Sequence, residues 1–223
     1  MRRCMPCKLF QARQQGKVGT CYKRLRGREY GMQSSDPPHA RTSSAISVRH
    51  ATPEDAAAIA AMYNYYVTNT VVTFEQEAVS AAEVANRISG VNQAGLPWLV
   101  AELSAESSGR SETTGRSGQA PELVGYAYAT GWKSRPAYRY TTEVSVYVAP
   151  GREGLGVGSA LYGHLLPEIA SLGVHVALGG ITLPNAGSVA LHEKFGFHKV
   201  AHLEEVGFKF GRWIDVGYWQ RTL

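Results

Sequence analysis

The sequence predicts a mixed-sheet α/β domain, and three observations lead to that fold class. Runs of alternating apolar and polar residues, the two-residue period of a β-strand, occur along the body of the chain. Between them lie stretches whose apolar residues recur every three or four positions, as they do in helices packed against a core. Residues 140–172 join one such strand to one such helix through a glycine-rich turn. The predicted order is one strand, two helices, three strands, a helix, a strand, a helix and two strands.

The first part of the domain contains one short strand and two helices. Residues 46–49 (ISVR) alternate as a strand. Thr52, Pro53 and the two acids that follow predict the start of a helix, because a capping hydroxyl, a proline in the first position and negative charge all favour a helix N-terminus. Residues 80–91 predict the second helix. The buried stripe of the first helix is predicted to consist of Ile59, Met62, Tyr63, Tyr66 and Val67.

Two strands that we expect to pair as a hairpin follow at residues 98–103 and 123–129. Between them, residues 104–121 consist mainly of Ser, Thr, Gly and Arg and contain almost no apolar residue. A segment of this composition buries too little apolar surface to offset the entropy lost on ordering. We therefore expect a flexible insertion at the surface between the two strands.

The second part of the domain alternates strands and helices. Residues 143–148 place valines on one face and Glu143, Ser145 and Tyr147 on the other. The next helix contains Pro167, which costs roughly 3 kcal/mol in an undistorted helix interior, so we expect a kink or an early last turn. The domain is completed by a strand at 174–182, a helix at 185–194 that Gly196 closes, and antiparallel strands at 197–205 and 213–221.

Four glycines, at positions 151, 154, 156 and 158, connect the strand at 143–148 to its helix. Without a Cβ the backbone turns tightly and approaches a ligand closely, and the unpaired N–H groups at a helix start can bind a phosphate. A Walker loop is excluded because no lysine follows the glycines, and the spacing does not fit the dinucleotide fingerprint. The pattern x-x-x-G-x-G remains, over residues 153–158. The alternative is a tight connection that binds nothing.

Residues 1–31 differ in composition from the rest of the chain. They hold nine Lys or Arg against one acid, whereas residues 32–223 hold fourteen against seventeen. The body is mildly acidic, so the basic balance of the whole chain is no argument for a nucleic-acid partner. We interpret residues 1–45 as a basic disordered extension and linker, with an organelle transit peptide as the alternative and Met32 as the preferred start. The domain then spans residues 46–223.

The three cysteines, Cys4, Cys7 and Cys21, all lie in that extension. No second, well-spaced pair of ligands accompanies the C-x-x-C at Cys4 and Cys7, so we expect no metal site. A body without cysteine has no disulfide framework, which suits a reducing compartment, and we predict a cytoplasmic protein. No apolar run reaches the about 18 residues of a membrane-spanning helix, and we expect no membrane partner.

A series of longer strings in the body identifies a family resemblance. They are PWLVAE from Pro97, GYAYA from Gly125, WKSRPAY from Trp132, EVSVYV from Glu143, GLGVGSALYGHLL from Gly154, LPNAGSVALHEKFGF from Leu183 and GFKFGRWIDVGYWQ from Gly207. In this order they resemble the GNAT superfamily of acyl-CoA-dependent N-acetyltransferases, and more narrowly its phosphinothricin and methionine sulfoximine acetyltransferase branch. The resemblance implies a mixed, mostly antiparallel central sheet flanked by helices, with two strands that splay apart at the acyl-CoA site.

The resemblance implies acetyl-CoA as the co-substrate, held by the glycine-rich loop, by the edge of the preceding strand and by one helix cap. The implied acyl-CoA residues are Val146, Tyr147, Val148, Glu153, Gly154, Leu155, Gly156, Val157, Gly158, Ser159 and Asn185. Two features depart from the family pattern. The insertion at 104–121 is not typical, and Glu153 stands where the family usually has Gln or Arg. We expect Arg152 to offset this anion beside the pyrophosphate.

Two residues are candidates for acid–base chemistry. Glu143 is the predicted general base, directly or through a water, because a carboxylate on a buried strand beside a cleft has a pKa raised by desolvation. The alternative is a structural glutamate paired with a cation. The resemblance implies an acid or base role for His192, and Ser188, one turn earlier, shares its helix face. The alternative is a histidine that only packs.

The predicted acceptor site consists of Lys133 and Arg135, suited to a carboxylate or phosphinate, with Phe74, Tyr138 and Trp213 as walls. The alternative is a solvated basic loop. The leading hypothesis is acetylation of the α-amine of a small amino-acid analogue such as phosphinothricin, methionine sulfoximine or methionine sulfone, which is a detoxification reaction. The alternatives are an enzyme for another small amine, such as an ordinary amino acid or a polyamine, and a non-catalytic acyl-CoA sensor. By analogy with relatives we expect a homodimer.

Overall fold

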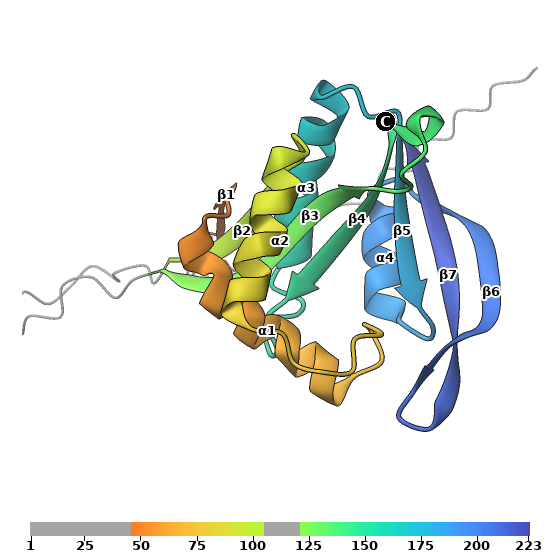
Figure 1. Ribbon diagram of the computed structural model, residues 1–223, viewed down its shortest axis with the longest axis horizontal. Helices are drawn as coiled ribbons and strands as arrows, with labels where there is room; N and C mark the ends of the chain where they lie inside the picture. Colours follow the sequence, from red (N-terminus) through yellow and green to blue (C-terminus); the bar gives the residue numbers. More distant parts are fainter. Residues whose placement is uncertain (1–45, 105–120) are drawn as a thin grey trace, which may run out of the picture. The chain divides into compact units, whose positions relative to one another are not determined.

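The structure of the protein is a computed structural model that describes residues 46–104 and 121–223 (Figure 1). Within these ranges the chain forms a seven-stranded sheet and four α-helices. The predicted extension at residues 1–45 and nearly all of the predicted insertion at residues 104–121 lie outside the described residues. Both therefore stay predictions.

The helices and strands follow the order that the sequence predicts. The helices are α1 (Ala56–Asn69), α2 (Ala81–Gln93), α3 (Val157–Ser171) and α4 (Ala186–Lys194), with short 3₁₀ turns at Pro53–Asp55 and Pro136–Tyr138. The strands are β1 (Ile46–His50), β2 (Trp98–Leu103), β3 (Glu122–Gly131), β4 (Thr141–Val148), β5 (Val176–Thr182), β6 (His198–Lys209) and β7 (Arg212–Thr222). The described elements confirm the predicted mixed α/β fold.

The sheet is mostly antiparallel, with one parallel pair near its middle. The strand order is β1-β2-β3-β4-β5-β7-β6, and β4 with β5 is the parallel pair. These two strands pair only between residues 141–143 and 176–178. Beyond Glu143 they continue without pairing to each other, and Figure 1 shows them spreading apart. The predicted splay of two strands is therefore present.

Helices cover both faces of the sheet. On one face α3 packs through residues such as Leu161 and Ile169, and α4 lies against the same core. On the other face α1 and α2 pack through residues such as Ile59 and Ile88. In the predicted stripe of α1, four residues are buried and Tyr66 is half-buried.

The two-residue period of β4 divides its side chains between these faces. Val144 is buried in the core beneath α3, whereas Tyr147 packs against the core beneath α1 and α2. Alternation along a strand places Glu143 on the same face as Tyr147. Glu143 therefore lies on the α1 and α2 side, at the point where β4 and β5 part.

The helix α3 extends further than one of its two predicted outcomes allows. It continues through Pro167 to Ser171, so the predicted early last turn is wrong, and the alternative of a kink stays a prediction. Leu166 and Ile169 are buried beside the proline and stabilise this turn, and the carbonyl of exposed Gly163, which the missing N–H leaves free, can bond water.

The last hairpin is longer than the sequence predicts, because β6 reaches Lys209 rather than residue 205. Its register against β7 shifts between Leu203 and Gly207, and Glu205 has a positive φ of 54°. This bulge interrupts the alternation by which a strand is read from sequence. The hairpin turns at Phe210 and Gly211, which both have positive φ, as in the two-residue turns that suit twisted strands.

Candidate active site

A cleft of about 630 Å³ opens where β4 and β5 separate. Residues 144–148 of β4 line one side, Gly180, Ile181 and Thr182 of β5 line the other, and the first turn of α3 and the inner side of α4 close the ends. The hydroxyl of Tyr66 donates to the carbonyl oxygen of Val148 at 2.5 Å. Burial raises the pKa of Tyr66 to about 12, so this hydroxyl keeps its proton.

The glycine-rich loop presents open backbone at one end of this cleft. Gly154 and Gly156 line the cleft with φ of +77° and +90°, a region that only glycine adopts at little cost. No atom outside the adjoining backbone lies within 4 Å of where a Cβ would stand at either position. Gly156 is the N-cap of α3 and offers no side-chain cap to the first amides of the helix. These amides and the positive helix end fit a diphosphate.

The other two glycines of the loop differ in their relation to the cleft. Gly151 also has a positive φ, of +78°, but it does not line the cleft. At Gly158 an added Cβ would stand 2.9 Å from Cδ2 of Leu191. Gly158 lines the cleft, and its lack of a side chain also allows α3 to pack closely against α4.

The charges around the loop differ from the expected arrangement. Arg152 donates to the carboxylate of Glu122 at 2.6 Å, so its guanidinium is paired away from Glu153. Glu153 lines the cleft. Lys194, in the last turn of α4, donates to the hydroxyl of Ser159 at 2.8 Å and also lines the cleft. Lys194 thus supplies a cation at the start of α3 that the sequence reasoning missed.

Most of the predicted acyl-CoA residues meet in this one cleft. Leu155 is the exception, because its side chain is exposed and does not line it. Asn185 caps α4 as predicted, its side-chain oxygen accepting the N–H of Ser188 at 3.1 Å. The residues that line the cleft are Val146, Tyr147, Val148, Glu153, Gly154, Gly156, Val157, Gly158, Ser159 and Asn185.

Glu143 is half-buried where β4 and β5 part, next to the residues that line the cleft but not among them. A Cβ added to Gly180 would stand 2.9 Å from Oε1 of Glu143, so the carboxylate lies directly over β5. Burial raises the pKa of Glu143. In the part of the chain that the structure describes, no Lys, Arg or His forms an ion pair with this carboxylate. The geometry therefore gives no support to the alternative of a glutamate held by a cation.

His192 is buried, with both ring nitrogens occupied. Nδ1 lies 2.7 Å from the carbonyl oxygen of Ser188, which can only accept, so we assign the proton to Nδ1. Nε2 then accepts from the hydroxyl of Tyr162 at 2.9 Å. Burial lowers the pKa of His192 and keeps the ring neutral. Ser188 shares this face as predicted, its Oγ lying 3.4 Å from Nδ1.

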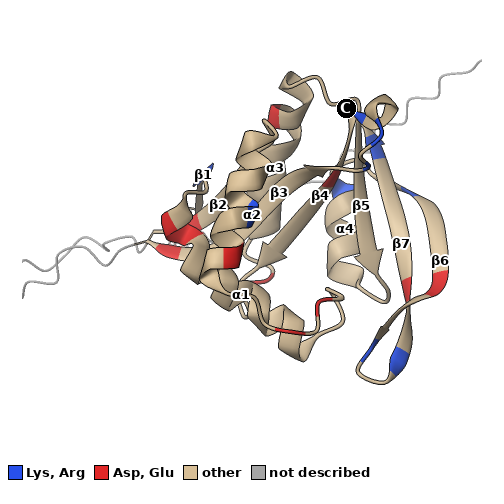
Figure 2. Cartoon of the chain, in the orientation of Figure 1, with Lys and Arg blue, Asp and Glu red and all other residues tan. Residues whose placement is uncertain are grey.

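The five predicted acceptor residues fall into two groups. Lys133, Arg135 and Tyr138 belong to the loop between β3 and β4, which Figure 2 shows as a basic segment. The ammonium of Lys133 lies 4.5 Å from the centre of the Trp132 ring and 5.8 Å from that of Tyr138.

The second group lies toward the far end of the last hairpin. Phe74 packs against Gly207 of β6, and the exposed ring of Trp213 lies 4.9 Å from that of Phe208. The strand register places the start of β4 level with the C-terminal end of β7, with β5 between the two strands. That end of β7 is nine residues from Trp213 along the strand, a distance of about 30 Å. The structure does not bring the two groups together within one chain.

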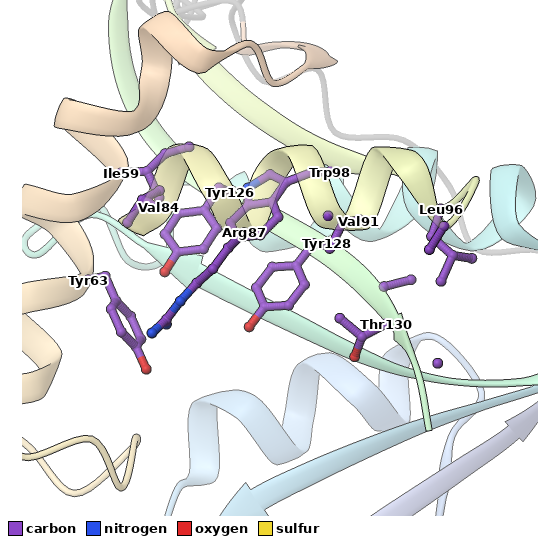
Figure 3. A pocket seen from close by; sticks show the side chains of 14 residues that line it. Ile59, Tyr63, Val84, Arg87, Val91, Leu96, Trp98, Tyr126, Tyr128 and Thr130 are labelled. Carbon is purple, nitrogen blue, oxygen red and sulfur yellow. The ribbon is translucent and has the colours of Figure 1, made fainter. Parts of the chain in front are cut away.

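A second pocket, of about 360 Å³, lies between α2 and the sheet (Figure 3). Its floor is a stack of aromatic rings, in which Trp98 and Tyr128 lie 4.2 Å apart at 14°. Arg87 of α2 reaches into it and donates to Glu75 at 2.7 Å and to Glu83 at 2.9 Å. The sequence reasoning missed this pocket. The signal in the sequence was that Tyr126 and Tyr128, two residues apart, lie on the same face of their strand, and that Tyr128 pairs with Trp98 of the neighbouring strand.

Comparison with known proteins shows the family of the chain. The model of the family "Acetyltransferase (GNAT) domain" matches residues 117–217. The chain is 35% identical to the phosphinothricin N-acetyltransferase of Streptomyces coelicolor, over 80% of this chain and 96% of that protein. The chain belongs to the GNAT acetyltransferase family. It is therefore an N-acetyltransferase, and the resemblance seen in the sequence is confirmed.

The chain is also similar to a second curated acetyltransferase and to a solved structure with acetyl-CoA bound. The L-methionine sulfoximine/L-methionine sulfone acetyltransferase of Salmonella typhimurium is 33% identical, over 80% of this chain and 95% of that protein. The crystal structure of a phosphinothricin acetyltransferase from Sinorhizobium meliloti in complex with acetyl-CoA is 32% identical, with a TM-score of 0.69, covering 80% of this chain and 88% of that one. None of the helices among residues 46–104 and 121–223 has the length and apolar character needed to cross a bilayer.

Proposed function

We propose that this N-acetyltransferase transfers the acetyl group of acetyl-CoA to the α-amine of a small amino acid or amino-acid analogue. The first candidates are phosphinothricin, methionine sulfoximine and methionine sulfone, because relatives carry these names. The observation that carries the proposal is the position of Glu143. It has no cation partner among the described residues, and it stands at the fork from which the cleft opens.

The cleft and its loop fit the thioester co-substrate. Acetyl-CoA supplies an activated acetyl group and a thiol leaving group. The backbone amides of residues 154–159 would hold its diphosphate, with Lys194 adding a positive charge at the same place. The free edge of β4 beyond Glu143 offers main-chain groups to the amide-bearing arm.

Glu143 would act as the general base, directly or through one water. An α-ammonium must lose a proton before its nitrogen can attack, and burial raises the pKa of Glu143 toward that of the amine. The nitrogen then bonds to the acetyl carbon, the C–S bond breaks, and the thiolate leaves and takes up a proton. Holding both reactants in register contributes about 7–11 kcal/mol to lowering the barrier.

His192 would support the site rather than exchange protons during turnover. Its Nε2 lone pair is engaged by Tyr162 and its Nδ1 proton by Ser188. The imidazole packs against Gly179 of β5 and lines the cleft, so it stiffens that wall. An acid or base role would require the Tyr162 hydrogen bond to break first.

The test measures thiol release from acetyl-CoA with each candidate amine. We expect release with at least one amino acid or analogue, and a fall of about 100-fold or more in kcat for Glu143→Gln with little change in acetyl-CoA affinity. Glu204→Gln, at an exposed position of β6, is the matched control and should retain activity. Unchanged turnover in Glu143→Gln would remove Glu143 from the mechanism. Release with none of the amines would favour the sensor, which acetyltransferase relatives at present disfavour.

Three wider predictions concern detoxification, the oligomeric state and the cellular location. Acetylation would detoxify a toxic amino-acid analogue, because the amide product cannot carry the ammonium charge. A homodimer is supported by exposed apolar side chains on the last hairpin, including Phe208, Phe210 and Trp213. Light scattering coupled to gel filtration would show a monomer if this is wrong. The cytoplasmic location stays a prediction from the absence of cysteine in the body.

A further inference from the structure

The aromatic pocket between α2 and the sheet has no part in holding the thioester. Its volume of about 360 Å³ is at the small end of the range for ligand sites. The rings of Trp98, Tyr126 and Tyr128 lie nearly parallel, at 9–17° to one another, and form a flat apolar floor. Gly90 of α2 and Ala94, which follows this helix, lie at the exposed rim, where small side chains leave the pocket accessible.

One end of this pocket borders the predicted base. Thr130 lines the pocket and pairs with Glu143 across β3 and β4. Residues directly opposite in an antiparallel pair project their side chains on the same face, about 4.5–5.5 Å apart at Cβ. On its other side Glu143 lies over Gly180, which lines the cleft. The carboxylate therefore stands between the two pockets, as a base serving both reactants must.

The charges in the pocket indicate which side chains it can accept. Arg87 is the one charged residue among the described residues that line it, and Figure 3 shows it reaching between Tyr63 and Tyr128. Glu75 and Glu83 already pair with its guanidinium. An anionic side chain would have to displace one of these carboxylates. A neutral apolar or aromatic side chain would stack on the rings and leave the pairs intact.

We propose that this pocket holds the side chain of the acceptor amino acid and selects neutral apolar or aromatic side chains over anionic ones. The inference rests on the proposed acetylation of an α-amine. It places the side chain beneath α2, the amine beside Glu143 and the carboxylate toward the basic loop that follows Gly131. Among the candidate acceptors, it ranks methionine analogues above phosphinothricin, whose side chain carries a phosphinate.

The kinetic test compares kcat/KM for L-phenylalanine, L-methionine sulfone, L-alanine and phosphinothricin. Gly90→Phe fills the rim, where no atom outside the adjoining helix backbone lies within 4 Å of the added Cβ. We expect the parent to prefer phenylalanine or methionine sulfone over alanine and phosphinothricin by about tenfold or more, and Gly90→Phe to abolish that preference. Gly163→Phe, at an exposed and equally open position of α3, is the control. A parent preference for phosphinothricin, or a preference unchanged in Gly90→Phe, would overturn the proposal.

A binding measurement separates failure of the pocket from failure of the proposed function. In protein with ¹⁵N-labelled tryptophan and bound CoA, L-phenylalanine should shift the indole signal of Trp98, assigned with Trp98→Phe. The shift should persist in Gly163→Phe and disappear in Gly90→Phe. A shift without turnover would support the pocket and contradict the acetylation of these acceptors. If the Trp98 signal does not shift at about 10 mM phenylalanine, the proposed role of the pocket is overturned, whatever the turnover measurement shows.

Discussion

Gly156→Ala tests whether the loop at the start of α3 binds the co-substrate through its backbone. Gly156 has φ +90° and ψ 2°, and a non-glycine residue held in such a left-handed conformation costs about 1–2 kcal/mol. Gly151 has φ +78° but lies outside the cleft, so alanine there carries the same backbone cost. At both positions the added Cβ meets no atom within 4 Å beyond the adjoining backbone, so no clash contributes. The pair of variants therefore separates backbone strain from ligand contact.

The expected effect on binding follows from one lost contact. In Gly156→Ala the loop relaxes away from its strained φ and the methyl group enters the space in front of the first amides of α3. Losing one hydrogen bond to a charged group costs about 1.5–3 kcal/mol. That cost corresponds to about 10- to 150-fold in Kd for acetyl-CoA. For Gly151→Ala we expect a change in Kd of no more than about twofold, since no contact with the ligand is lost.

Isothermal titration calorimetry with acetyl-CoA and thermal unfolding of both variants provide the assay. Both should unfold about 2–8 °C below the parent, because 1–2 kcal/mol corresponds to that shift in a domain of this size. Only Gly156→Ala should bind acetyl-CoA more weakly. Equal loss of affinity in the two variants, or loss in neither, would refute the assignment of the loop.

Three further predictions concern residues around the cleft. Tyr162→Phe leaves Nε2 of buried His192 without a hydrogen-bond donor, so thermal denaturation should show a free energy of unfolding lower by about 1–3 kcal/mol. Tyr65→Phe, which changes an exposed ring, is the control. A Tyr162→Phe variant as stable as the parent would contradict the hydrogen bond. Burial raises the pKa of Glu143, so the stability that its protonated form contributes is present at acid pH and lost as pH rises through the raised pKa. The glutamine in Glu143→Gln cannot ionise, so this variant should gain stability relative to the parent as the pH rises from about 4 to about 8. A difference in stability that does not vary with pH would be inconsistent with the burial effect. Lys194→Met should weaken acetyl-CoA binding about threefold to tenfold at low salt and much less at about 0.5 M salt. The control Lys199→Met should not weaken binding at either salt concentration. An effect of Lys194→Met that is independent of salt would count against a charge contact.

Much of the fold could be predicted because short-range patterns determine it. The alternation of valines in β4, the cap at Asn185 and the glycine at 196 each act through neighbouring residues and were all placed correctly. The end of β6 was not, because the bulge near Glu205 breaks the alternation from which a strand is recognised. The continuation of α3 past Pro167 depends on buried Leu166 and Ile169, and tertiary packing of this kind leaves no local signal.

Residue patterns predicted the candidate site where one chain segment forms it, whereas Asn185 and His192, at the cap and in the last turn of α4, were placed by the family resemblance. The loop from Glu153 to Ser159 and the strand before it were found because strand, glycines and helix are contiguous in the sequence. The partners of His192 and the second pocket combine residues from different elements, such as Tyr162 with His192 and Arg87 with Trp98. The spacing of these residues in the sequence follows neither the helix period nor the strand period, so it does not predict that they meet. The same reason explains why Trp213 was assigned to a wall that the register places far from Lys133.

The central claim is that Glu143, at the fork of β4 and β5, takes the proton of the acceptor amine. The most direct measurement is the pH dependence of kcat/KM for the best acceptor, in the parent and in Glu143→Gln. The parent should show a rising limb governed by a carboxyl group whose pKa burial raises above the ordinary value of glutamate. That limb should be absent from the residual activity of Glu143→Gln. If the same limb persists in the variant, another group accepts the proton and the account is contradicted.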